Sequence, residues 1–134
     1  MNATKPLRYG QDWTREESIL AFDLYCRIPF RKTKPNNPDV IALAELLHRS
    51  PGSVARKLGN FGAFDPKLAE QDISGLTHTS VLDEQVWNEF HSDWERLVTE
   101  AESLRTKFVA KLPAGVRIKS EKVFLSRRNT KTLK

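Results

Sequence analysis

The chain is poor in residues on which several classes of protein depend. Its 134 residues include one cysteine, Cys26, so no internal disulfide can form, which fits a reducing cytoplasm. No run approaches the roughly 18 consecutive apolar residues of a membrane helix. The first ten residues also lack the apolar core of a secretory signal. These absences favour one cytoplasmic domain without a membrane partner.

The residues of common catalytic and metal sites are also scarce. The three histidines, His48, His78 and His91, fall on different predicted elements. The sequence contains no His-Glu-x-x-His, no Cys-x-x-Cys and no glycine-rich phosphate loop. The polar run 77–80 has no carboxylate partner that the sequence can identify. We therefore expect no cofactor, no metal and no enzymatic activity in this chain.

Charge is abundant but unevenly distributed. The net charge of +5 divides into +4 for residues 1–64 (ten Lys/Arg, six Asp/Glu), −6 for residues 65–110 (four and ten) and +7 for residues 111–134 (eight and one). This pattern is expected if both ends of the chain meet a polyanion and the middle does not. Ordinary charge scatter with a solubilising tail is the alternative.

Hydrophobic periodicity predicts an all-α fold. A capping box at Thr14–Glu17 begins the first helix and Pro29 ends it. The second helix begins at Asn37–Asp39 and the third runs from Ser50 to about Asn60. The first three helices form a trihelical helix-turn-helix unit, and one or two further helices brace it.

The acidic part of the chain predicts those further helices. One begins near Ser80, and a capping box at Ser92–Glu95 begins another that ends at Pro113. Residues 62–80 are predicted to be a loop, and residues 116–125 have weak strand-like alternation. The predicted division is a flexible N-terminus (1–11), a helical DNA-binding domain (12–110) and a flexible basic tail or linker (111–134). Aromatic residues at helical core spacing are predicted to pack inside: Trp13, Phe22, Phe61, Trp87, Phe90, Trp94 and Phe108.

Residues 43–58, LAELLHRSPGSVARKL, point to a function more specifically than any other segment. Leu43 and Leu47 lie four residues apart, and a turn at His48 follows, where such motifs often have glycine. Ser50 caps the next helix, with proline at its first position. Val54, Leu58 and Phe61 recur at core spacing. This is the pattern of a helix-turn-helix, whose second helix can lie in the major groove of DNA.

Candidate DNA contacts follow from this pattern. Arg56 could form a bidentate contact to guanine, with Lys57 beside it, while Ser53 and Asn60 could reach bases or phosphate. Arg49 at the turn and the amides after Ser50 favour phosphate. The loop cations Arg31, Lys32 and Lys34 could hold a backbone phosphate, and the basic tail could act as an electrostatic arm.

Each candidate has a structural alternative. Arg56 and Lys57 could belong to a solvated helical face, the loop charges could only keep the loop soluble, and the helix pair could be purely structural. The tail could be a linker to another domain. The acidic helices after Ser80 suggest a different class of function, a protein-interaction module.

Three separated segments resemble one family. Residues 13–25 (WTREESILAFDLY), 53–61 (SVARKLGNF) and 75–90 (GLTHTSVLDEQVWNEF) occur in the same order as in the N-terminal domain of certain bacterial HNH-type restriction endonucleases. The resemblance covers roughly residues 12–105, and the Trp-Thr-x-Glu-Glu opening also resembles Myb-like DNA-binding domains. The first resemblance implies DNA recognition in restriction or phage defence, in some members on modified DNA.

The same resemblance implies a partner. In that family an HNH nuclease domain follows this region, and its site needs a histidine base. Residues 106–134 contain no histidine, so that site is absent here. The sequence therefore predicts double-stranded DNA binding without cleavage, with a downstream HNH nuclease domain as a possible partner.

Overall fold

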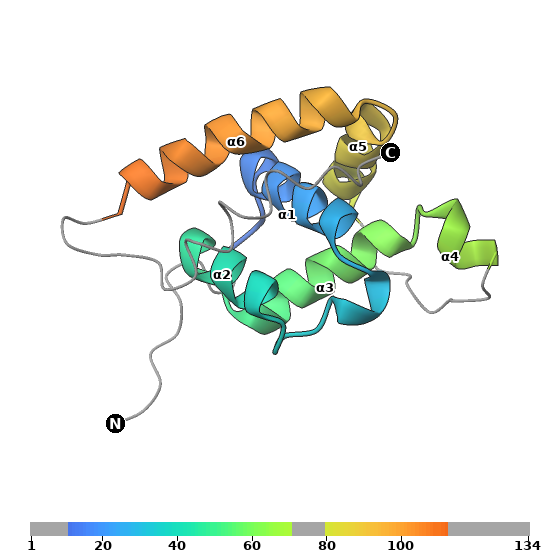
Figure 1. Ribbon diagram of the computed structural model, residues 1–134, viewed down its shortest axis with the longest axis horizontal. Helices are drawn as coiled ribbons and strands as arrows, with labels where there is room; N and C mark the ends of the chain where they lie inside the picture. The colour runs from blue at the N-terminus through green and yellow to red at the C-terminus, as the bar shows by residue number, and fades with distance from the viewer. Residues whose placement is uncertain (1–10, 71–79, 113–134) are drawn as a thin grey trace.

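The computed structural model describes residues 11–70 and 80–112, and every regular element in these ranges is a helix (Figure 1). The elements in chain order are α1 (Arg15–Arg27), the short 3-10 helix η1 (Phe30–Lys32), α2 (Pro38–Leu47), α3 (Pro51–Gly62), α4 (Pro66–Glu70), α5 (Val81–Phe90) and α6 (Trp94–Ala110). The predicted all-α class is confirmed.

Most helices begin where the sequence predicts, because the capping residues lie within three positions of the amides they bind. At α1, the Thr14 hydroxyl accepts from the Glu17 amide while the Glu17 carboxylate accepts from the Thr14 amide. Ser50 caps α3 through its side chain. Ser80 and Asp83 form a second capping box at α5.

The end of α2 is closed by a residue in the left-handed region. His48 has φ 58° and ψ 40°, and it is the one non-glycine residue with positive φ in the described ranges. The Arg49 amide donates to the Ala44 carbonyl at 3.0 Å and the His48 amide to the Glu45 carbonyl at 3.3 Å. This pair of bonds is the Schellman arrangement, which satisfies carbonyls at a helix end and turns the chain sharply.

Three details differ from the prediction. The predicted loop 62–80 contains α4, a five-residue helix too short to produce a periodic pattern. The N-cap of α6 is Asp93, whose carboxylate accepts from the Arg96 amide, so the predicted box at Ser92 is one residue too early. The loop after Pro29 contains η1.

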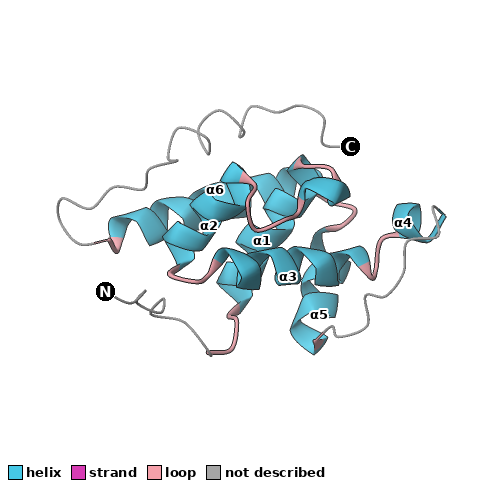
Figure 2. Ribbon diagram, turned by 90° about the horizontal axis from the view of Figure 1, so that it is seen from below, coloured by secondary structure: helices cyan, strands magenta, loops and turns pink. Residues whose placement is uncertain are grey.

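Helix α1 lies at the centre of the molecule. It packs against α2, α3, α5 and α6, while α2 also packs against α3 (Figures 1 and 2). The Phe22 ring of α1 lies 4.9 Å from the Phe61 ring of α3 and 5.2 Å from the Trp87 ring of α5. Burying one such side chain contributes about 2 kcal/mol. This shared core fixes α3 against the rest of the molecule.

The predicted core aromatics are all at least partly buried. Phe22, Phe61 and Phe90 are fully enclosed, and the others pack against the same core. Cys26 is half-buried, and burial raises the pKa of its thiol, with the nearby Asp23 and Asp65 carboxylates adding to the effect. In the described ranges, no helix combines the length and the apolar character needed to cross a bilayer.

Several predictions concern residues outside the described ranges. They are the flexible N-terminus apart from residue 11, the strand-like alternation at 116–125, the basic tail beyond residue 112, the polar run 77–79 and the 71–79 part of the predicted loop.

Candidate nucleic-acid interface

The connection between α2 and α3 consists of residues 48–50, and the two helices pack against each other. Leu43 and Leu47 of α2 are buried, as are Val54, Leu58 and Phe61 of α3. These are the positions that the sequence predicts for the inward faces. The hydrophobic spacing in the sequence therefore correctly predicts which side of each helix is buried.

The opposite side of α3 is narrow and carries small residues around one long cation. Gly52 and Arg56 are exposed, as is Ala63, the C-cap of the helix. A Cβ atom built on Gly52 would meet nothing within 4 Å, so the backbone faces open space there. Gly52 and Arg56 lie four residues apart and share one face. Arg56 makes no ion pair with any described residue, so its guanidinium is available to a ligand.

Lys57 does not lie on that face, and its predicted exposure is wrong. Its side chain is buried, and its Nζ donates to Oδ1 of Asp83 at 2.6 Å. The same Nζ lies 5.0 Å from the centre of the Trp13 ring. The cause is α5, which packs on α3 and brings a carboxylate from 26 positions away. A lysine neutralised in this way is not positioned to meet DNA.

Arg49, the predicted phosphate contact at the turn, is also buried. Only 3% of its side chain is exposed, and its Nε and Nη2 donate to the two carboxylate oxygens of Glu17 at 3.1 and 2.9 Å. Its guanidinium carbon lies 4.6 Å from the centre of the Trp13 ring. Arg49 therefore joins the α2–α3 turn to α1, and its geometry does not support the predicted phosphate contact.

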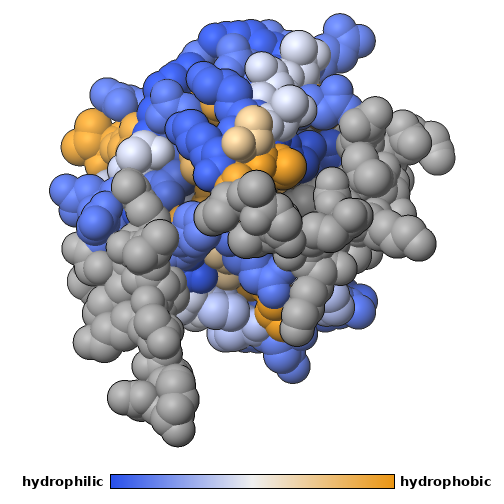
Figure 3. All heavy atoms as spheres, turned by 90° about the vertical axis from the view of Figure 1, so that its left-hand side faces the viewer, coloured by the Kyte–Doolittle hydropathy of each residue, from blue (hydrophilic) through white to orange (hydrophobic). Residues whose placement is uncertain are grey.

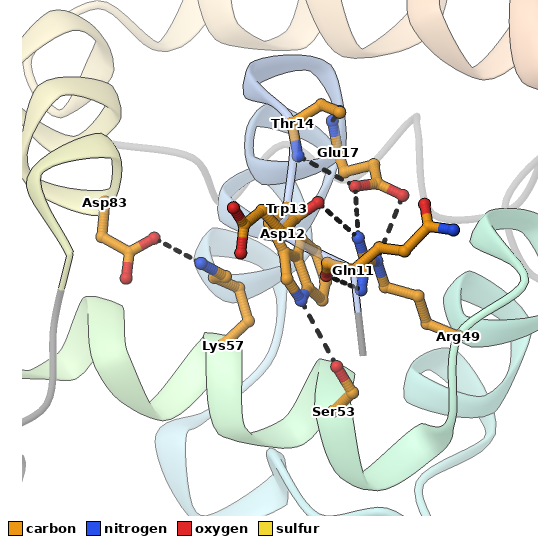
Figure 4. A network of polar contacts seen from close by, with 9 residues as sticks. All are labelled: Gln11, Asp12, Trp13, Thr14, Glu17, Arg49, Ser53, Lys57 and Asp83. Atoms are coloured by element: carbon orange, nitrogen blue, oxygen red, sulfur yellow. Dashed lines mark hydrogen bonds and ion pairs between the residues drawn. The ribbon is translucent and has the colours of Figure 1, made fainter. Parts of the chain in front are cut away.

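Figure 4 shows that these groups form one network, with the Trp13 ring between the two cations. We call Glu17, Arg49, Trp13, Lys57 and Asp83 the Trp13 clamp. Each cation faces the aromatic ring on one side and a carboxylate on the other. Cation–π contacts of this kind add to the ion pairs when the groups are shielded from water. The clamp links α1, the turn, α3 and α5.

The remaining polar candidates on α3 already have partners. The Ser50 hydroxyl accepts from the Ser53 amide at 3.1 Å. The Ser53 hydroxyl accepts from Trp13 Nε1 at 3.3 Å. Asn60 Nδ2 donates to the second oxygen of Asp83 at 3.2 Å. All three are half-buried, so Arg56 is the candidate on α3 with the most freedom to contact DNA.

The loop between α1 and α2 supplies further cations. Arg31, Lys32 and Lys34 are exposed, and none makes an ion pair with a described residue. The Tyr25 ring lies 6.5 Å from the Phe30 ring, which begins η1, and 6.2 Å from the Phe61 ring of α3. The basic loop is thereby held close to the second half of α3.

One acidic residue of α5, Glu89, forms ion pairs within the protein. Glu89 accepts hydrogen bonds from Arg15, at 2.6 and 3.0 Å, and from Arg96. The bonds from Arg15 are the main reason that the pKa of Glu89 lies below its ordinary value. Glu84, Asp93 and Glu95 remain exposed.

Sequence reasoning missed the Trp13 clamp. The sequence predicts Glu17 as part of a capping box, and in the structure both Glu17 and Asp83 occupy the third position of such a box. Their second role depends on Arg49 and Lys57, which lie 32 and 26 positions away. A local pattern carries no signal for such distant pairs. Within residues 11–70 and 80–112, no group of three His, Cys, Asp or Glu residues could hold a metal ion.

Comparisons of the chain with known protein families, with curated proteins and with solved structures give no match.

Proposed function

We propose that this chain binds double-stranded DNA, with α2, the turn and α3 acting as a helix-turn-helix and α3 lying in the major groove. The observation that carries the proposal is the exposed face of α3. It presents bare backbone at Gly52 and the exposed Arg56 guanidinium, which makes no ion pair within residues 11–70 and 80–112. A helix with such a face can approach base edges closely, because no bulky side chain keeps it away.

The exposed cations of the loop between α1 and α2 support the same orientation. Arg31, Lys32 and Lys34 are exposed on the loop that the Tyr25 ring connects to Phe61 of α3. Phosphate contacts of this kind position a protein on DNA, whereas contacts to base edges give specificity. We therefore assign the loop cations to the phosphate backbone and Arg56 to a guanine.

The resemblance to HNH-type restriction endonucleases suggests the biological setting. In this proposal the chain supplies target recognition in restriction or phage defence, and a separate HNH nuclease domain supplies cleavage. Metal-dependent cleavage of DNA by the chain alone would contradict this division of roles.

A protein-interaction module built on α5 and α6 is the second candidate. Val81 favours it, because it is the one large hydrophobic side chain that is well exposed in the described ranges, at 72%. However, Asp83 and Glu89 are engaged in internal ion pairs, which leaves fewer acids for a partner. The described part of the face at the C-terminal end of α6 is mainly hydrophilic, with small separate hydrophobic areas (Figure 3). Docking surfaces for proteins usually present a larger apolar patch.

A titration of labelled duplex DNA, followed by fluorescence anisotropy between 50 and 200 mM salt, tests the proposal. Four phosphate-neutralising cations predict a slope of log K against log salt of about −4 or steeper. Arg56→Ala should weaken binding by about tenfold or more, since a bidentate guanine contact is lost. Lys67→Ala, which removes an exposed cation from α4, is the matched control and should leave the affinity within about twofold.

The duplexes should include unmodified and methylated versions of the same sequences, because the related endonucleases include some that act on modified DNA. Absence of binding to every duplex at 50 mM salt would contradict the proposed function. Equal losses for Arg56→Ala and Lys67→Ala would contradict the role of α3.

A further inference from the structure

A pocket of about 380 Å³ lies where the ends of three helices meet. Its described walls are the start of α1, the end of α2 with His48, and the last two turns of α6. Figure 1 shows that the C-terminal end of α6 extends past the N-terminal end of α1, which leaves room beneath it. Pockets that bind small molecules measure about 300–1,000 Å³, so this one suits a small ligand.

The apolar stripe of α6 continues beyond the part that the rest of the protein covers. Leu97, Ala101 and Leu104 are buried, whereas Phe108, one turn further on, is only half-buried. Leu104 and Phe108 line the pocket together with Leu46 of α2. An apolar group placed here would remove hydrophobic surface from water, which favours binding.

The charged side chains around the pocket favour an anion. Lys107 and Lys111 line it from one face of α6, four positions apart, and both are exposed. Neither makes an ion pair with another residue in the described ranges. Among the described lining residues Glu16 is the one exposed acid, since Glu17 is buried and paired with Arg49. Two exposed lysines therefore oppose one exposed carboxylate, which leaves a single positive charge for a ligand.

We infer that this pocket binds a small organic acid with one carboxylate and an apolar body. The carboxylate lies between the ammonium groups of Lys107 and Lys111, and the apolar body covers Leu104 and Phe108. Hydrogen bonds between charged partners are among the stronger ones in proteins. An inorganic anion fits less well, because it would leave the apolar wall in contact with water.

The surroundings of the pocket favour a small molecule over a protein. The described part of the face at the C-terminal end of α6 carries small, separate hydrophobic areas and no wide apolar surface (Figure 3). The pocket is also separate from the residues to which we assign DNA contacts, because its described lining includes no residue of α3 or of the loop 31–34. The inference therefore does not depend on the proposed function.

Octanoate is the test ligand, because it joins one carboxylate to a short apolar chain. It is added to the full chain, labelled with nitrogen-15, at concentrations too low for micelles to form. We expect saturable shifts of the amide signals of His48 and residues 104–111, with a Kd of about 1 mM or tighter. Octanol, which has the same chain without the charge, should give at most about a tenth of the shift at equal concentration.

Two matched variants separate the pocket lysines from the net charge of the protein. Lys107→Gln/Lys111→Gln should weaken octanoate binding by about tenfold or more, because the carboxylate loses both cations. Lys32→Gln/Lys34→Gln removes the same charge from the loop between α1 and α2 and should leave the Kd within about twofold. All four side chains are exposed, so both variants should melt at the temperature of the wild type.

Several results would overturn the inference. One is equal weakening in the two variants, since octanoate would then respond to net charge alone. Another is binding of octanol or of inorganic phosphate as tight as that of octanoate, and a third is the absence of saturable shifts at His48 and residues 104–111. Because these measurements contain no DNA, failure of the wild type to bind any duplex would contradict the proposed function and leave the pocket standing.

Discussion

His48 lies at the tightest bend of the chain, where α2 ends and the approach to α3 begins. A left-handed conformation brings the Cβ atom of a non-glycine residue close to the following carbonyl, at a cost of roughly 1–2 kcal/mol. Histidine tolerates this region better than a β-branched residue does. The strain persists because the two Schellman bonds and the packing of α2 on α3 hold the bend.

Substitution of His48 tests this bend directly. His48→Gly should raise the free energy of unfolding by about 0.5 kcal/mol, because the relief of strain exceeds the added entropy of the unfolded chain. His48→Val should lower it by about 1–2 kcal/mol. Since the side chain is exposed, these changes report backbone conformation and not lost packing. Urea denaturation measures both, and equal stability of the two variants would be inconsistent with the left-handed turn.

Arg56 and Lys57 are adjacent in sequence but have opposite roles in the structure. One turns outward without an ion-pair partner in the described ranges, and the other is buried against Asp83. The 100° rotation between neighbouring helix positions separates a surface facing solvent from one facing α5. The charge of a basic residue on α3 therefore does not indicate a DNA contact unless its position on the helix is known.

At the scale of elements, the Trp13 clamp determines how α3 is presented. Hydrophobic contacts hold α3 near α1, but they are not directional. The ion pairs of Arg49 and Lys57 involve carboxylates on α1 and α5 and so restrict the rotation of α3 about its axis. We infer that this restriction keeps Gly52 and Arg56 on the exposed side.

The structural role of the Lys57–Asp83 ion pair can be tested through the free energy of unfolding. Lys57→Met should lower the free energy of unfolding by about 3 kcal/mol, because it leaves the fully buried Asp83 carboxylate without its cation. Lys57→Met/Asp83→Asn should recover about half of that loss, since the neutral amide can still accept from Ser80 and Asn60. Thermal and urea unfolding provide the comparison. A loss below about 1 kcal/mol in the single variant would argue against a structural role for the pair.

The sequence predicts local features of the helices well and their long-range pairing poorly. The caps at Thr14, Ser50 and Ser80 are readable because the hydroxyl and the amide that it binds are three positions apart. The burial of Arg49 and Lys57 is not readable, since their partners lie on other helices. Helix α4 was missed because five residues complete little more than one turn.

At the scale of the whole molecule, exposed charge is unevenly distributed over the helices. Four exposed cations, Arg31, Lys32, Lys34 and Arg56, lie on α3 and the loop between α1 and α2, whereas Lys67 lies on α4 and Lys107 and Lys111 lie at the C-terminal end of α6. The exposed acids Glu84, Asp93 and Glu95 lie on α5 and α6. The exposed acids on α5 and around the start of α6 favour an orientation in which that part of the molecule lies away from a polyanion.

The most direct test of DNA binding through α3 is a map of the amide signals that change when duplex DNA is added. The 15.4 kDa chain, labelled with nitrogen-15, is small enough for such spectra. The account predicts the largest changes at Gly52, Arg56 and residues 31–34, with the signals of α6 nearly unchanged. Changes confined to α5 and α6, or no change at low salt, would contradict it.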